Sequence, residues 1–174
     1  CRNVKVKYTP DAVQMIVDAI PSATHPQNKE AFSLATATYV ATLFNENDTL
    51  RQNVTSELAE LQLSDGSWAW WKGMNGSIWT TTTVARLLAR LDYVHCGNAA
   101  TSSMLTKALP FMAKRIAEEA EQLRKLRKQY PKADLAPSET ALDILYVFAI
   151  SGISGNIKAK QLLDANSKDV SYLI

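Results

Sequence analysis

Residues 61–73 read Leu-Gln-Leu-Ser-Asp-Gly-Ser-Trp-Ala-Trp-Trp-Lys-Gly and hold the strongest structural signal in this chain. Apolar residues at helical spacing come before this stretch over 49–63 and after it over 81–93. Residues 64–67 are of the types that turns prefer. Four tryptophans then fall within twelve residues, namely Trp68, Trp70, Trp71 and Trp79. The stretch therefore predicts two helices joined by a turn and a dense aromatic loop.

Outward from this stretch, apolar residues keep recurring at intervals of three and four, which is typical of amphipathic helices. The predicted helices are, in chain order, 11–19, 32–45, 49–63, 81–93, 101–130, 141–150 and 157–163. Pro21 is expected to end the first of them, and Pro110 to start or kink the longest. Only residues 4–8 alternate at period two, which predicts a short extended segment. We therefore expect an all-α fold, with residues 1–174 forming one domain of antiparallel helices.

The composition fits a globular chain and excludes several classes of function. The 174 residues are 47% hydrophobic, and 19 basic residues face 17 acidic ones without segregating by sign, so nucleic acid is not an indicated partner. No stretch approaches the ~18 consecutive apolar residues of a membrane-spanning helix. Two cysteines, Cys1 and Cys96, and two histidines, His25 and His95, form no cluster at metal-ligand spacing. We expect no metal and no cofactor.

The loop and the helix after it resemble part of a known family. Leu61-Gln62, then Asp65-Gly-Ser-Trp68, then Trp71-Lys-Gly73 and a helix over 84–91 are similar to the helical α/α-toroid domain of bacterial alpha-2-macroglobulins. Asp-Gly-x-Trp by itself also occurs in terpene cyclases and prenyltransferases, which share the toroid. The resemblance is therefore carried by the order of these features and not by the turn alone.

Flanking segments extend the resemblance through most of the chain. Residues 6–9 and 19–21 look like the approach to the family's thioester site, and Leu145-Tyr146 looks like a later helix. The family's toroid contains about a dozen helices, so the resemblance implies an incomplete toroid that corresponds to the N-terminal half of the thioester-type domain. An incomplete toroid is expected to leave apolar surface for another segment to cover.

The thioester site is where the chain departs from the family. Members carry Cys-Gly-Glu-Gln or Cys-Ala-Glu-Gln a few residues after a proline, and the cysteine thiol bonds to the glutamine side chain. Counting from Pro21, four other residues stand there: Thr24, His25, Pro26 and Gln27. A shifted alignment puts Asn28 and Glu30 at the cysteine and glutamate positions, and neither alignment offers a thiol. The resemblance thus implies a member that lacks the thioester.

The resemblance implies that this domain is not an enzyme. It implies that the whole protein binds or inhibits proteases, or serves cell-envelope defence. Its expected partners are other domains of the same polypeptide and proteases. The expected location is the periplasm, the cell envelope or the cell exterior, with Cys1 a candidate for lipid attachment. The alternative is a carbohydrate-active or cyclase-like toroid enzyme that uses the loop from Trp68 to Trp79 and Asp65, and a free-standing helical binding module is the third reading.

Each residue of the loop has its own expectation. We expect Trp68 and Trp79 to belong to the core. Trp70 and Trp71 are adjacent and cannot both point inward, so core and exposed contact surface stay open for them. Asp65 is expected to be a turn residue, since a glycosidase acid would need a second carboxylate facing it.

Two residues outside the loop also have expected roles. Asp143 lies in a nearly all-apolar helix, where a buried carboxylate needs a partner, and Arg86 or Arg90 is the expected one. His25 has no nucleophile beside it in the sequence, so we expect a surface histidine.

Overall fold

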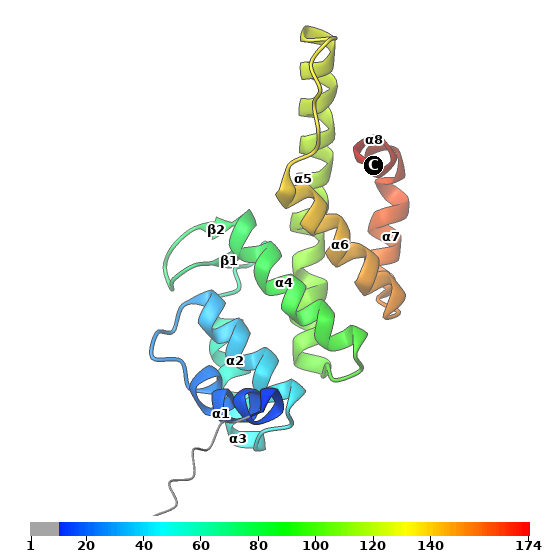
Figure 1. The fold of residues 1–174 in the computed structure, drawn as a ribbon. Helices are drawn as coiled ribbons and strands as arrows, with labels where there is room; N and C mark the ends of the chain where they lie inside the picture. The colour runs from blue at the N-terminus through cyan, green and yellow to red at the C-terminus, as the bar shows by residue number, and fades with distance from the viewer. Residues whose placement is uncertain (1–10) are drawn as a thin grey trace, which may run out of the picture.

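The computed structural model describes residues 11–174, so Cys1 and the extended segment expected over 4–8 lie outside the described residues. Within them the chain forms eight helices and one hairpin of two-residue strands (Figure 1). In chain order these are α1 (Ala12–Thr24), α2 (Ala31–Leu43), α3 (Asp48–Glu60), β1 (Trp68–Ala69), β2 (Gly76–Ser77), α4 (Ile78–Tyr93), α5 (Ala99–Gln129), α6 (Glu139–Ile153), α7 (Ile157–Ala165) and α8 (Ser167–Leu173). The all-α prediction is confirmed.

Side-chain caps fix where the helices begin. Seven of the eight have an N-cap residue whose side chain accepts a hydrogen bond from the first turn: Asp11, Glu30, Asn47, Ser77, Asn98, Ser138 and Asn156. Such caps satisfy backbone N–H groups that have no partner within the helix. The cap at Ser77 explains why α4 starts at Ile78, ahead of the predicted start at residue 81.

The helix bounds correct the role expected for Pro21, narrow that of Pro110 and add short elements. Pro21 does not end α1, which continues to Thr24, because a proline near the end removes only one backbone bond and the Thr24 hydroxyl caps the carbonyl of Ile20 at 3.0 Å. Pro110 lies inside α5, on its exposed side, and does not start that helix, so a kink is the part of its expected role that stays a prediction. Helix α8 and the β1–β2 hairpin were not predicted, because both are too short to show a period.

Three antiparallel helical hairpins, α2–α3, α4–α5 and α6–α7, turn in the same way. Each turn contains one residue in the left-handed region: Asn45 (φ 53°), His95 (φ 58°) and Gly155 (φ 90°). In each turn the next N–H donates to a carbonyl five residues back at 2.9 Å: Glu46 to Ala41, Cys96 to Leu91 and Asn156 to Ser151. This is the Schellman closure, and it ends the first helix of each hairpin in the same way.

The hairpins stack into two rows of helices. Helix α4 packs against α2 and α6, and the three run in the same direction (Figure 1). Their partners form the second row, in which α5 contacts α3 and α7, while α1 packs on α2 and α8 on α5. The first helices of the hairpins thus lie beside one another, as do the second helices.

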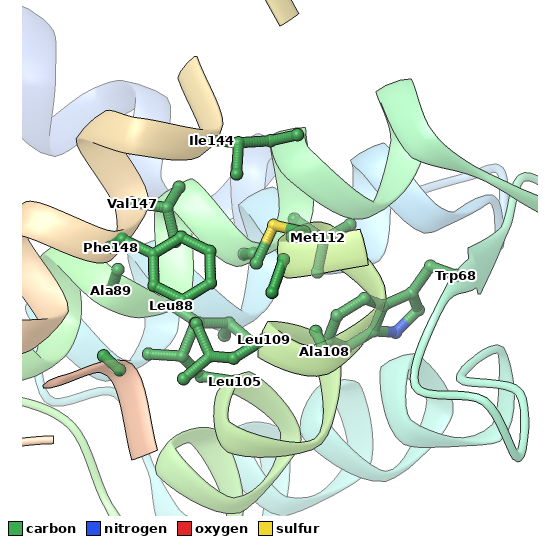
Figure 2. Close-up of a cluster of buried hydrophobic side chains, with 14 of the residues drawn as sticks. Trp68, Leu88, Ala89, Leu105, Ala108, Leu109, Met112, Ile144, Val147 and Phe148 are labelled. Carbon is green, nitrogen blue, oxygen red and sulfur yellow. The ribbon is translucent and has the colours of Figure 1, made fainter. Parts of the chain in front are cut away.

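The core fills the space between the rows. Figure 2 shows Trp68 from the loop beside side chains of α4, α5 and α6: Leu88, Ala89, Leu105, Ala108, Leu109, Met112, Ile144, Val147 and Phe148. The predicted apolar seam of the longest helix is buried from Leu105 to Leu123. Its last predicted member, Tyr130, is 51% exposed, because the end of α5 extends beyond the other helices (Figure 1). Each large apolar side chain in this core contributes about 1.5–3 kcal/mol through burial.

Candidate functional site

The tryptophan loop is held at its base by the small hairpin. Trp68 pairs with Ser77 and Ala69 with Gly76, so residues 70–75 form the exposed tip between the strands. Gly76 is required there, because a Cβ at this position would lie 1.9 Å from the Ser67 hydroxyl oxygen. The loop is thus a defined structure with an inner base and an outer tip.

The inner side of the loop is part of the core. Trp68 is fully buried, and its indole Nε1 donates to the Leu58 carbonyl at 3.1 Å while its backbone N–H donates to the Thr81 hydroxyl at 2.9 Å. The Gln62 amide donates to the carbonyls of Gly66 at 3.1 Å and Met104 at 2.8 Å, which ties the turn to α5. The structural role expected for Trp68 is confirmed.

The outer side of the loop presents aromatic rings to solvent. Trp70, which is partly buried, stacks on Trp79 with the ring centroids 5.4 Å apart and the planes 23° from parallel. Trp79 is 54% exposed, Met74 53% and Trp71 42%. The expectation that Trp79 belongs to the core is wrong: α4 starts at Ile78, and this start turns the Trp79 side chain outward. As expected for adjacent residues, Trp70 and Trp71 have different environments: Trp70 is half-buried and Trp71 is exposed.

Paired charges stand beside this aromatic surface. Lys72, in the loop, bonds to Glu60 at 2.9 Å, and Lys29 bonds to Glu57. The hydrogen bond and the Coulomb attraction lower the pKa of Glu60 and raise that of Lys72. The loop is also tied to α2, where the Ala31 N–H donates to the Trp70 carbonyl at 3.0 Å. The outer loop therefore combines exposed rings with charges that neutralise one another.

Asp65 behaves as a turn residue. Its carboxylate accepts hydrogen bonds from the Ser67 hydroxyl at 2.6 Å and the Ser67 N–H at 3.0 Å. These bonds lower the pKa of Asp65, the hydroxyl contributing most. A general acid of a glycosidase needs a raised pKa, so the bonding of Asp65 suits the turn and not proton donation.

The four residues that the resemblance puts at the thioester position end α1 and begin the connection to α2. Thr24 is buried as the last residue of α1, and His25 is its C-cap. A His25 ring nitrogen lies 3.0 Å from the Pro21 carbonyl oxygen, and the side chain is exposed, as expected. Pro26 is half-buried and Gln27 is exposed.

The other residues that bear on a thioester have structural roles elsewhere. Glu30, the glutamate position in the shifted alignment, is the N-cap of α2 and accepts from the N–H groups of Phe32 and Ser33. The Cys96 thiol donates to the Val94 carbonyl at 3.6 Å in the turn between α4 and α5. The connection between α1 and α2 therefore contains no thiol, which a thioester requires.

Arg86 is confirmed as a partner of Asp143, but the expectation that Asp143 is buried is wrong. Arg86 on α4 lies 3.3 Å from the Asp143 carboxylate, but the two side chains are 41% and 39% exposed. Arg90 instead donates to the Tyr146 hydroxyl at 3.4 Å, and this bond raises the pKa of Arg90. The three polar side chains and Tyr146 tie α4 to α6 along the surface of one row.

Sequence reasoning missed one polar group, Asp92, which lies in the last turn of α4. It is half-buried, and burial raises its pKa. The signal was available in the sequence, because the last turn of a helix disfavours a carboxylate. Within residues 11–174 no three His, Cys, Asp or Glu side chains gather as a metal site. No helix in the same range is long and apolar enough to cross a membrane.

Comparison with protein-family models, with curated proteins and with solved structures finds no match for this chain. The likeness to bacterial alpha-2-macroglobulins therefore rests on the residues of the loop and its flanking segments, and what it implies about function is a proposal.

Proposed function

We propose that this chain is a non-catalytic domain of an alpha-2-macroglobulin-like protein that binds or inhibits proteases without a thioester. In this proposal the three hairpins are an arc of an α/α toroid, and the domain packs against other parts of the same polypeptide in the periplasm, cell envelope or cell exterior. The observation that carries the proposal is apolar surface left open at both ends of the helix rows.

At one end, α1 turns its apolar side to solvent. Val13, Ile16 and Val17 are 49–70% exposed, although they recur at the spacing of a buried helical face. Monomeric proteins rarely leave such a contiguous apolar face uncovered. A further segment that covers α1 would explain why its sequence is amphipathic.

At the other end, α6 is the last helix of the α2–α4–α6 row, and it also has an open apolar side. Leu142 is 51% exposed and Ile153 73%, and their spacing puts them on one side of the helix. Another side of α6 packs against α4. The open side is available to a helix that continues the row, which is what half a toroid would leave.

The residues at the thioester position support the non-covalent part of the proposal. Thr24 and His25 close α1, and no thiol stands between α1 and α2. Protease capture by such a protein would depend on bait cleavage and conformational change elsewhere in the polypeptide. If so, treatment of the full-length protein with methylamine, which cleaves thioesters, releases no new thiol.

The first test is the mass of the native polypeptide that contains this segment. We expect an antibody raised against residues 11–174 to capture a protein many times larger than 19.2 kDa, with peptides of this segment flanked on both sides by other sequence. A native product of about 19.2 kDa would overturn the proposal and favour a free-standing binding module.

The second test examines protease trapping by the full-length protein. After incubation with an excess of the protein, trypsin should lose activity on a large protein substrate and keep activity on a small peptide substrate. A protein whose bait region cannot be cut is the control, and it should leave both activities unchanged. Equal loss of both activities, or no loss of either, would refute the trapping function.

A further inference from the structure

A polar pocket of about 410 Å³ lies where the α4–α5 and α6–α7 turns meet. It is lined by side chains of Asp92, His95, Ser102, Ser154 and Asn156 and by two glycines, Gly97 and Gly155. None of its lining residues has an apolar side chain. The tryptophan loop and the connection between α1 and α2 contribute no residue to it, so the pocket is distinct from both.

Two glycines line this pocket, one on each turn. A Cβ at Gly97 would lie 2.0 Å from the Asp92 carboxylate oxygen Oδ1. Gly155 has φ +90°, and a Cβ there would meet no atom within 4 Å, so a larger residue would project into free space. Gly97 thus lets the Asp92 carboxylate pack closely against the backbone of the α4–α5 turn, and the space beside Gly155 is open.

Asp92 is the charged group of the pocket, and its charge is not balanced by the chain. One carboxylate oxygen, Oδ1, accepts from the Ser102 hydroxyl at 2.7 Å, and Ser102 is the only hydrogen-bond partner of the carboxylate within the described residues. No basic side chain of residues 11–174 forms an ion pair with it. A half-buried carboxylate without a counter-ion raises the free energy of the folded chain, and a bound cation would offset this.

The chemistry of the lining selects among ligands. Asp92 repels anions, and the pocket offers an apolar molecule no apolar side chain. A divalent metal prefers several carboxylate or imidazole ligands, and no group of three such side chains exists within residues 11–174. An organic cation fits, because its N–H groups can donate to the second oxygen of Asp92 and to the hydroxyl oxygens of Ser102 and Ser154.

We propose that this pocket binds the ammonium or guanidinium group of an organic cation, with Asp92 as its counter-ion. The group is carried either by a free amine or by a lysine or arginine side chain of a partner polypeptide. The pocket opens to solvent, so both kinds of ligand can reach it. This binding site is independent of the proposed macroglobulin function and can be tested without it.

The experiment is an NMR titration of the ¹⁵N-labelled full chain with defined probes. Butylammonium and methylguanidinium represent free cations, and capped Gly-Lys-Gly and Gly-Arg-Gly represent side chains of a polypeptide. Capped Gly-norleucine-Gly and Gly-Glu-Gly are the neutral and anionic controls. We expect saturable shifts of the amide signals of Gly97, Ser102 and Gly155 with the cations only, with a Kd on the order of 1 mM.

Comparison of the free cations with the cationic peptides identifies the source of the ligand. Tighter binding of the peptides than of the free cations assigns the pocket to a partner's lysine or arginine, and equal binding assigns it to free amines. Absence of saturable shifts with all four cations, or equal shifts with the norleucine peptide, would overturn the proposal. These outcomes require no mutation.

Matched variants test the role of the carboxylate. D92N keeps an oxygen that accepts from Ser102 and removes the charge, so we expect at least about tenfold weaker cation binding by a chain that melts no lower than the wild type. S102A removes the hydroxyl and keeps the charge, and should still bind. Asp164 is an exposed carboxylate on α7 outside the pocket, so D164N is the control and should bind as the wild type does. Undiminished binding by folded D92N would refute the assignment of Asp92.

Discussion

Trp68 and Trp79 lie eleven residues apart in the same loop region, and they have opposite environments. Trp68 is fully buried, and both of its N–H groups have acceptors. Trp79 is 54% exposed and touches the stacked ring of Trp70. The difference follows from the start of α4 at Ile78, which places Trp79 on the outer side of the first turn. Aromatic density marked the loop in the sequence, but the helix start decided which rings became core.

The same division runs through the rest of the loop. Its inner residues, from Gln62 to Trp68, are bonded to α3, α4 and α5. Its outer residues, 70–75, have exposed rings and surface ion pairs such as Lys72 with Glu60. We infer that changes on the inner side alter the stability of the fold, and that changes on the outer side alter mainly the surface.

The largest expected effect comes from truncating the inner tryptophan. W68A removes a fully buried indole and leaves a cavity between the rows, which should lower the free energy of unfolding by about 3–5 kcal/mol. Urea unfolding monitored by far-UV circular dichroism measures this change. W68F keeps most of the volume and loses only the bond to Leu58, so about 1–3 kcal/mol is expected. A loss below 1 kcal/mol for W68A would show that the inner side is not the anchor.

The next effect compares two glycines that both have positive φ. Gly66 (φ +86°) is on the inner side, and a Cβ there would lie 2.0 Å from the Lys107 carbonyl oxygen, so G66A should cost about 2–4 kcal/mol. Gly73 (φ +87°) is on the outer side and has no atom within 4 Å of such a Cβ, so G73A should cost only about 1–2 kcal/mol from backbone strain. Chemical denaturation of G66A and G73A measures the free energy of unfolding of each, and the difference between them reports the steric contact at Gly66. Equal losses would contradict the distinction between the inner and outer sides of the loop.

The particular elements show what could be predicted from sequence and what could not. The apolar seam from Leu105 to Leu123 and the role of Asp65 in the turn followed from periodicity and turn chemistry, both of which are local. The exposure of Trp79 and of α1 depends on which helices are present to cover them, and no local pattern contains that information. The polar pocket around Asp92 depends on two turns about sixty residues apart meeting in space.

A smaller effect is expected from the outer tryptophan. W79S removes a half-exposed ring and its stacking on Trp70, which should change the free energy of unfolding by about 0.5–1.5 kcal/mol. The near-UV circular dichroism of the stacked pair should be lost, while the far-UV spectrum stays the same. W71S, which removes an exposed ring outside the stack, is the control and should keep the near-UV signal of the pair. A loss as large as that of W68A would place Trp79 in the core after all.

The smallest effect concerns the pH dependence of the turn at Asp65. Hydrogen bonds from Ser67 lower the pKa of Asp65 in the folded state below that in the unfolded state, so its contribution to stability is present above the unfolded pKa and is lost as pH falls through the folded pKa. Since Asp65 is exposed, D65N should lower stability at pH 7 by less than about 0.5 kcal/mol, and the difference from wild type should vanish in acid.

D92N should show the opposite sign, because burial raises the pKa of Asp92, and the wild type then loses stability relative to D92N as pH rises through that raised pKa. Thermal melts of the three proteins from pH 7 to pH 3 measure both trends. Parallel curves for D65N and D92N would show that the hydrogen bonds of the turn do not hold Asp65 ionised.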